Sequence, residues 1–210
     1  MPPLELMLAF FAAAAVFAYM PGPAMLYATA QTIARGRRAG LMASLGIHLG
    51  GYVHVIAAAF GLAALFEAVP ILYFILKIAG AAYLIVLGLA MILTRTRMPG
   101  SVPTLPQKSA RRAFYESITV EVLNPKTAVF YLAFLPQFTS EAATLPLWAQ
   151  LIILGTIVNV MFSSADLVCV ALADRIKAAI RSSHRTAGLA KRVAGGLLIG
   201  LGVNLALQRQ

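Results

Sequence analysis

Several ionisable side chains lie inside apolar stretches that are long enough to cross a bilayer, among them His48, Glu121, Lys126 and Asp166. A charge at the centre of a bilayer costs roughly 2.5–3.5 kcal/mol, so such groups are kept where they pair or face a wet cavity. At about 1.5 Å per helical residue, Lys126 falls near the midplane, and the two acids and His48 fall to one side of it.

These groups suit a carrier that moves protons together with a solute. A carboxyl group beside a lysine in a desolvated cavity can gain and lose a proton near neutral pH. We therefore predict Asp166, Glu121 and His48 as candidates for proton coupling. In the alternative interpretation, the two acids serve only as structural partners of lysines, and His48 serves only as a hydrogen-bonding group between helices.

Two helix breaks lie near the middle of apolar runs, at Pro21-Gly22-Pro23 and at Asn124-Pro125-Lys126. Proline removes a backbone donor and clashes with the preceding turn, and glycine adds backbone freedom. Inside a membrane, unpaired backbone must be buried in protein or must line a cavity. We therefore interpret the two breaks as two halves of one midplane binding site.

The composition indicates an all-α integral membrane protein. Of the 210 residues, 60% are hydrophobic and only 11% are charged, whereas soluble domains carry about 25% charged residues. Helices of roughly 20 apolar residues span a bilayer. Six such spans fit the chain, as a single membrane domain over residues 1–210: 4–34, 39–66, 70–93, 113–136, 148–173 and 193–208.

The charge distribution sets the orientation of these spans. The net charge is +10, and most of the 17 Lys and Arg residues fall in three connections, at 35–38, 94–112 and 174–192. By the positive-inside rule these loops are cytoplasmic and both termini face outward. This pattern, with no continuous basic face, argues against nucleic-acid binding.

The six spans form two sets of three, 4–93 and 113–208, around the loop 94–112. The first set starts outside and the second starts inside, so the two have opposite topology. The first helix of each set carries a break at a similar depth. Paired Gly/Pro interruptions of this kind are typical of inverted-repeat transporters and point to their binding site.

The chain lacks the residues that a dithiol redox enzyme or a metal site would need. The chain has one cysteine, Cys169, so a dithiol redox enzyme is excluded, and we predict neither an enzyme nor a cofactor. His48 and His54 are six residues apart and do not share a helical face, so we predict no metal site. An inorganic-ion exporter and a non-transporting membrane subunit remain alternatives. Glycine pairs such as Gly46-x₃-Gly50 allow close helix packing, within the bundle or in a homodimer.

The breaks and their surroundings resemble the LysE/RhtB family of amino-acid exporters over nearly the whole chain. The matching segments, in order, are Pro21-Gly22-Pro23, Ala34 to Leu41, Lys77 to Leu84, Leu123-Asn124-Pro125-Lys126-Thr127 and Phe134 to Phe138. The resemblance implies export of amino acids or close derivatives from the bacterial cytoplasm through the inner membrane, driven by protons. It assigns substrate binding to Pro21, Gly22, Pro23, Asn124, Pro125 and Lys126.

Three positions depart from the family pattern. Many members have threonine before the first proline and a polar residue after the second, whereas this chain has Met20 and Ala24. The site therefore loses two polar groups, which favours a less polar amino acid. Members often carry an amide or another polar residue at the position of Glu121, so its carboxyl group departs from the pattern as well.

Overall fold

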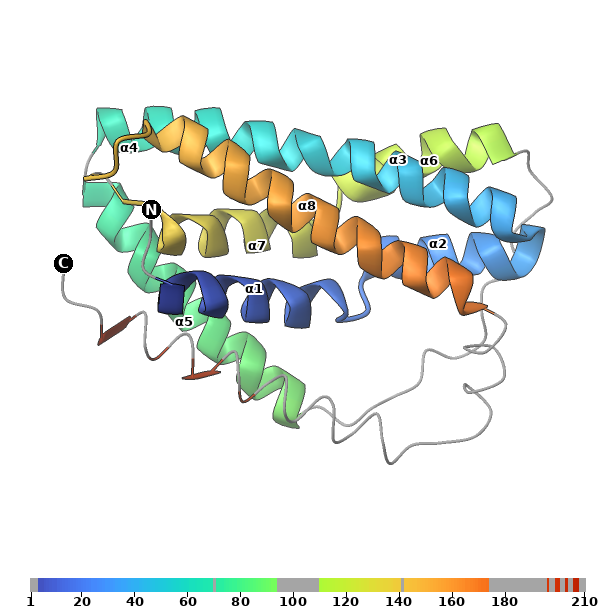
Figure 1. Cartoon of the computed structure of the whole chain (residues 1–210), viewed down its shortest axis with the longest axis horizontal. Coiled ribbons are helices and arrows are strands. Elements are labelled where there is room, and N and C mark those ends of the chain that lie inside the picture. The colour runs from blue at the N-terminus through green and yellow to red at the C-terminus, as the bar shows by residue number, and fades with distance from the viewer. Residues whose placement is uncertain are drawn as a thin grey trace.

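The computed structural model describes residues 4–69, 71–93, 110–140 and 142–173, together with a few positions between 196 and 207 (Figure 1). All regular structure in these ranges is helical, which confirms the predicted all-α class. The predicted last span at 193–208 and most of the two longer basic loops, 94–112 and 174–192, lie outside the described ranges. The division into two repeats of three helices therefore stays a prediction.

Both predicted breaks are present, and each bends its span to nearly the same extent. Helices α1 and α2 meet at 49°, and helices α6 and α7 meet at 48°. Proline stands at the first position of both α2 and α7, where its missing N–H costs nothing. The elements are α1 Leu4–Ala18, α2 Pro23–Arg35, α6 Ala110–Val122, α7 Pro125–Phe134 and the 3₁₀ turn η2 Leu135–Phe138.

Two longer helices are long and apolar enough to cross a membrane. The first is continuous over Arg37–Ala68, and the second is α8, Leu147–Ala171. If each bent pair also counts as one span, the described residues contain up to four. The first long helix contains a π-helical segment that we did not predict; its parts are α3 Arg37–Ile56, η1 Ala57–Leu62 and α4 Ala63–Ala68. Helix α5, Ile71–Leu93, covers the predicted third span.

Helices α1 and α7 pack antiparallel through a row of aromatic rings. Phe10 stacks on Phe134 with centroids 5.5 Å apart and meets Phe138 at 5.2 Å, and Phe17 stacks on Phe130 at 3.8 Å. Rising numbers on α1 thus meet falling numbers on α7. In Figure 1 the first bent pair runs from left to right and the second from right to left. The two breaks are therefore brought to the same level of the bundle.

Glycines on α3 allow α6 to approach at backbone distance. A Cβ on Gly46 would overlap the carbonyl oxygen of Phe114 and the hydroxyl of Ser117. A Cβ on Gly50 would lie 2.9 Å from the carbonyl oxygen of Ile118. This Gly-x₃-Gly pair therefore packs within the bundle, as one of the two sequence interpretations predicted.

We expect Gly46→Ala to destabilise the protein by about 1–3 kcal/mol, because the new methyl group meets a backbone carbonyl that cannot rotate away. The matched control is Gly61→Ala, since a Cβ there meets nothing within 4 Å. Thermal unfolding of the detergent-purified variants is the measurement. Equal melting temperatures for the two variants would show that the α3–α6 contact is looser than described.

Candidate functional site

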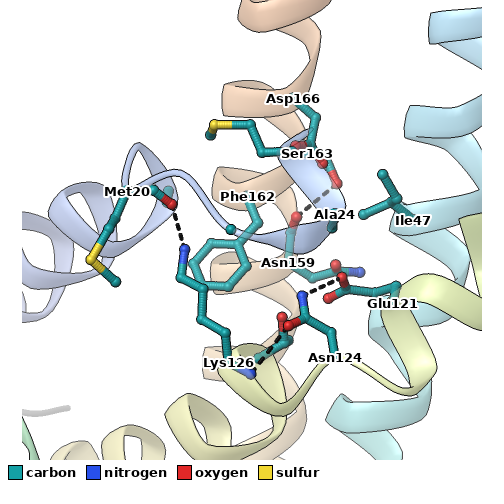
Figure 2. A pocket seen from close by; sticks show the side chains of 14 residues that line it. Met20, Ala24, Ile47, Glu121, Asn124, Lys126, Asn159, Phe162, Ser163 and Asp166 are labelled. Atoms are coloured by element: carbon teal, nitrogen blue, oxygen red, sulfur yellow. Dashed lines mark hydrogen bonds between the residues drawn. The ribbon is translucent and has the colours of Figure 1, made fainter. Parts of the chain in front are cut away.

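A cavity of ≈ 30 Å³ lies where the two breaks meet (Figure 2). This volume admits about two water molecules, so the present conformation is too narrow for an amino acid. The cavity is lined from α2, α3, α6, α7, α8 and the end of α1 by Ala18, Met20, Gly22, Ala24, Met25, Ile47, Glu121, Asn124, Lys126, Thr127, Asn159, Phe162, Ser163 and Asp166.

Two helix N-termini face this cavity. Gly22 caps α2 with an extended backbone, and Asn124 caps α7. Backbone N–H groups at helix N-termini carry partial positive charge and bind anions such as carboxylates. Of the prolines predicted to bind substrate, Pro21, Pro23 and Pro125 are exposed and do not line the cavity; they shape the breaks that expose these N-termini.

Lys126 reaches across the cavity to the end of α1. Its Nζ donates hydrogen bonds to the carbonyl oxygens of Phe17, at 3.2 Å, and of Met20. The same nitrogen lies 4.4 Å from the centre of the Phe17 ring. The Phe17 carbonyl also accepts from the backbone N–H of Met20 at 3.2 Å, so the lysine adds a second donor there and supplies a donor to the Met20 carbonyl just beyond the end of α1.

Asn124 links the second break to Glu121. Its Oδ1 accepts a hydrogen bond from the backbone N–H of Lys126 at 3.1 Å, and its Nδ2 donates to Glu121 Oε2 at 3.0 Å. His54 Nε2 donates to the carbonyl oxygen of Glu121 at 2.8 Å. The same carbonyl accepts from the backbone N–H of Asn124 at 2.9 Å, so His54 adds a second, buried donor from α3 at this break.

Asp166 approaches the cavity from α8 and is only 4% exposed. In the described part of the chain, no group donates a hydrogen bond to its carboxyl oxygens. Figure 2 shows it on the far side of the cavity from Lys126. A buried carboxyl group without fixed donors is free to exchange a proton or to accept a cation.

His48 does not line the cavity itself but contacts Ser163, which does. Ser163, which lines the cavity, donates to the carbonyl oxygen of Asn159 at 2.8 Å, so the 2.6 Å contact between His48 Nδ1 and Ser163 Oγ has His48 as the donor. Asn159 Nδ2 in turn donates to the carbonyl oxygen of His48 at 3.0 Å. These bonds tie α3 to α8 beside the site.

The sequence analysis missed Asn159 and Ser163 as part of the site. Together with Asp166 they lie at positions i, i+4 and i+7 of α8 and so share one helical face. Polar residues repeating at this spacing within an apolar span were the signal that could have found them. No group of three His, Cys, Asp or Glu residues suited to a metal occurs among the described residues.

The chain is similar in sequence to a family of membrane proteins. The family model for the LysE type translocator matches residues 15–209. An uncharacterised membrane protein of Pseudomonas aeruginosa, PA4757, is 30% identical over 191 residues, which cover 89% of this chain and 88% of that protein.

Two further relatives have names that state a function. The homoserine/homoserine lactone efflux protein of Salmonella typhi is 34% identical over 192 residues, with 90% of each chain covered. The leucine efflux protein of Enterobacter sp. strain 638 is 28% identical over 189 residues, which cover 89% of this chain and 88% of that protein. No solved structure matches the chain significantly. The match over nearly the whole chain shows that this membrane protein belongs to the LysE type translocator family.

Proposed function

We propose that this protein exports neutral amino acids or close derivatives across the bacterial inner membrane, coupled to protons. The observation that carries the proposal is the cavity between the two breaks, which holds the complementary groups for an amino acid. The N-termini of α2 and α7 suit a carboxylate, and carboxylate and carbonyl oxygens suit an ammonium group. Membership of a translocator family and two relatives named as amino-acid efflux proteins support it.

A neutral and rather apolar side chain suits the remaining wall of the cavity. That wall consists of Met20, Ala24, Met25, Ile47 and Phe162, and none of these residues offers a charge to a third ionic group. The names of two relatives, a leucine and a homoserine efflux protein, agree with an uncharged substrate. A lysine substrate would place a second ammonium against this apolar surface at a desolvation cost.

Proton coupling is assigned to the carboxyl groups of the cavity. Asp166 has no hydrogen-bond donor in the described part of the chain, whereas Glu121 is held by Asn124. We therefore propose Asp166 as the main candidate for the group that carries the transported proton, and Glu121 as the second candidate. His48 supports this face of α8 through Ser163 and does not itself line the cavity.

Alternating access in this proposal uses two inverted halves. The equal bends of 49° and 48° and the antiparallel packing of α1 on α7 are what two inverted repeats require of their first helices. The basic connections face the cytoplasm and both termini face outward. Export then proceeds by rocking of the halves around the cavity, in a monomer or in each protomer of a homodimer.

Efflux from cells that overproduce the protein tests the proposed function. Cells loaded with each amino acid in turn are followed for release, with Gly61→Ala as the folded control variant and Asn124→Ala as the inactive one. We expect faster release of neutral amino acids with the native chain and Gly61→Ala only. If no amino acid leaves faster than from cells without the protein, the chain is a non-transporting subunit or carries another solute.

A further inference from the structure

The end of α1 forms a binding site for a primary ammonium group, and a side chain of the protein itself fills it. Two carbonyl oxygens, from Phe17 and Met20, accept from Lys126 Nζ, and the Phe17 ring lies under the same nitrogen at 4.4 Å. Carbonyl acceptors combined with an aromatic face are the groups that recognise an alkylammonium ion. A substrate amino acid carries the same chemical group as the lysine side chain.

The lysine binds neutral carbonyls although two acids line the same cavity. No ion pair within 4.0 Å joins Lys126 to Glu121 or Asp166, all three of which the structure describes. All three side chains nevertheless line the same small cavity. Lys126 therefore has an alternative position available, paired with a carboxylate, to which it can move when the carbonyl site is taken.

We propose that the carbonyl site formed by Phe17 and Met20 binds the substrate's α-ammonium group, and that Lys126 is a tethered occupant which the substrate displaces. This inference rests on the proposed function, because it names which part of the cavity binds which part of the amino acid. Displacement moves Lys126 toward Asp166 and Glu121, and substrate release lets it return. The Met20 carbonyl then has an ammonium donor in both states, while the Phe17 carbonyl also keeps the backbone N–H of Met20 as a donor.

Two other roles for Lys126 predict different changes in ligand affinity when the lysine is removed. If Lys126 held the substrate carboxylate directly, removing its charge would weaken every carboxylate-bearing ligand. If it served only as a strut across the break, its removal would lower stability without improving any ligand's affinity. In the displacement scheme its removal improves the affinity of ammonium-bearing ligands, because a competitor is gone. The apparent affinity of a site is reduced by the fraction of time that the site is blocked.

Gly22 gives an independent way to move the lysine without removing it. A Cβ on Gly22 would lie 2.7 Å from Lys126 Cδ and 3.2 Å from its Nζ. The backbone of Gly22 is extended, with φ −133° and ψ 177°, so alanine fits there without strain. Gly22→Ala therefore displaces the Lys126 side chain from the carbonyls and leaves its charge in the cavity.

Binding to the purified full-length protein tests the proposal with three probes of matched shape. L-Leucine carries both polar groups, 2-hydroxy-4-methylpentanoate lacks the ammonium, and 3-methylbutylammonium lacks the carboxylate. Calorimetry compares the native chain, Lys126→Met, Gly22→Ala, the double variant and Gly61→Ala. Methionine keeps most of the lysine stem and removes the ammonium group.

We expect both Lys126→Met and Gly22→Ala to bind 3-methylbutylammonium more tightly, by about tenfold if the lysine blocks the site nine-tenths of the time. The hydroxy acid gains nothing, and Gly22→Ala adds nothing once Lys126 is methionine, because both changes act on one interaction. Equal weakening of leucine and the hydroxy acid, or no gain for the ammonium probe in either variant, would overturn the proposal. A gain in ammonium binding without amino-acid efflux would support the carbonyl site as an ammonium site that Lys126 blocks, and would reject the proposed function and with it the amino acid as the occupant.

Discussion

Asp166→Asn is expected to abolish transport driven by a proton gradient while substrate exchange across the membrane continues. The change preserves the size and shape of a buried side chain and removes its ability to carry a proton. In proteoliposomes, counterflow of a neutral amino acid between equal concentrations then continues, because that exchange needs no net proton movement. Uptake or release driven by a pH difference falls to the level of vesicles without protein.

The expectation is strongest for Asp166 because of what surrounds it. Its carboxyl oxygens have no hydrogen-bond donor among the described residues, so protonation breaks no existing bond. Glu121, in contrast, accepts from Asn124 Nδ2, and a glutamine in its place can accept the same bond through its amide oxygen. Glu121→Gln should therefore reduce coupled transport less than Asp166→Asn does.

Three outcomes distinguish the carboxyl groups. Loss of coupling in Asp166→Asn alone supports the assignment. Loss of proton-coupled transport in Glu121→Gln alone would assign the transported proton to Glu121 and contradict our placing of Asp166 first. If both variants keep full proton-coupled transport, neither carboxyl group carries the proton and the coupling part of the proposed function is wrong.

The two breaks could be predicted from the sequence because covalent geometry dictates them. Pro23 and Pro125 each lack a backbone N–H and clash with the turn before them, so each favours the start of a new helix, preceded by an extended or capping residue. The structure places both at the first position of their helices. The rise per residue predicted that Glu121 and Asp166 lie at similar heights along their helices, and both line the same cavity.

The contacts across the cavity could not be predicted in this way. Counting along a helix gives height but not the direction in which a side chain faces its neighbours. The sequence therefore placed Lys126 near Glu121 but did not indicate that it reaches the carbonyls of Phe17 and Met20 on α1, about a hundred positions away in the chain. The π-helical segment in the second long helix was also missed, because no residue type marks it.

His48 illustrates the same limit. Its depth agrees with the cavity, and the sequence analysis counted it with the proton-coupling candidates. Its ring instead turns to Ser163, which stands between it and the cavity. Which of two neighbouring polar groups lines the site depends on helix rotation, and helix rotation is set by packing such as the contact of Gly51 with Asn159.

Asn124→Ala is expected to abolish export, because this side chain performs two tasks at the second break. Its Oδ1 caps α7 through the N–H of Lys126, and its Nδ2 holds the carboxyl group of Glu121. Loss of a cap costs about 1 kcal/mol, and loss of a hydrogen bond to a charged group costs about 1.5–3 kcal/mol. Efflux from overproducing cells should fall by at least about tenfold, and the melting temperature should fall with it.

Two further substitutions at this position separate the tasks. Asn124→Ser keeps a capping oxygen and removes the amide donor to Glu121, so it should lose export while its stability falls about 1 kcal/mol less than that of Asn124→Ala. Asn124→Asp also keeps the cap but places a second carboxyl group against the buried Glu121, so it too should lose export, with lower stability than Asn124→Ser because the two carboxyl groups repel each other. Full export by Asn124→Ser would show that Glu121 needs no donor from Asn124. The motif would then act only by starting α7, and the resemblance-based binding role of Asn124 would be reduced to that of a helix cap.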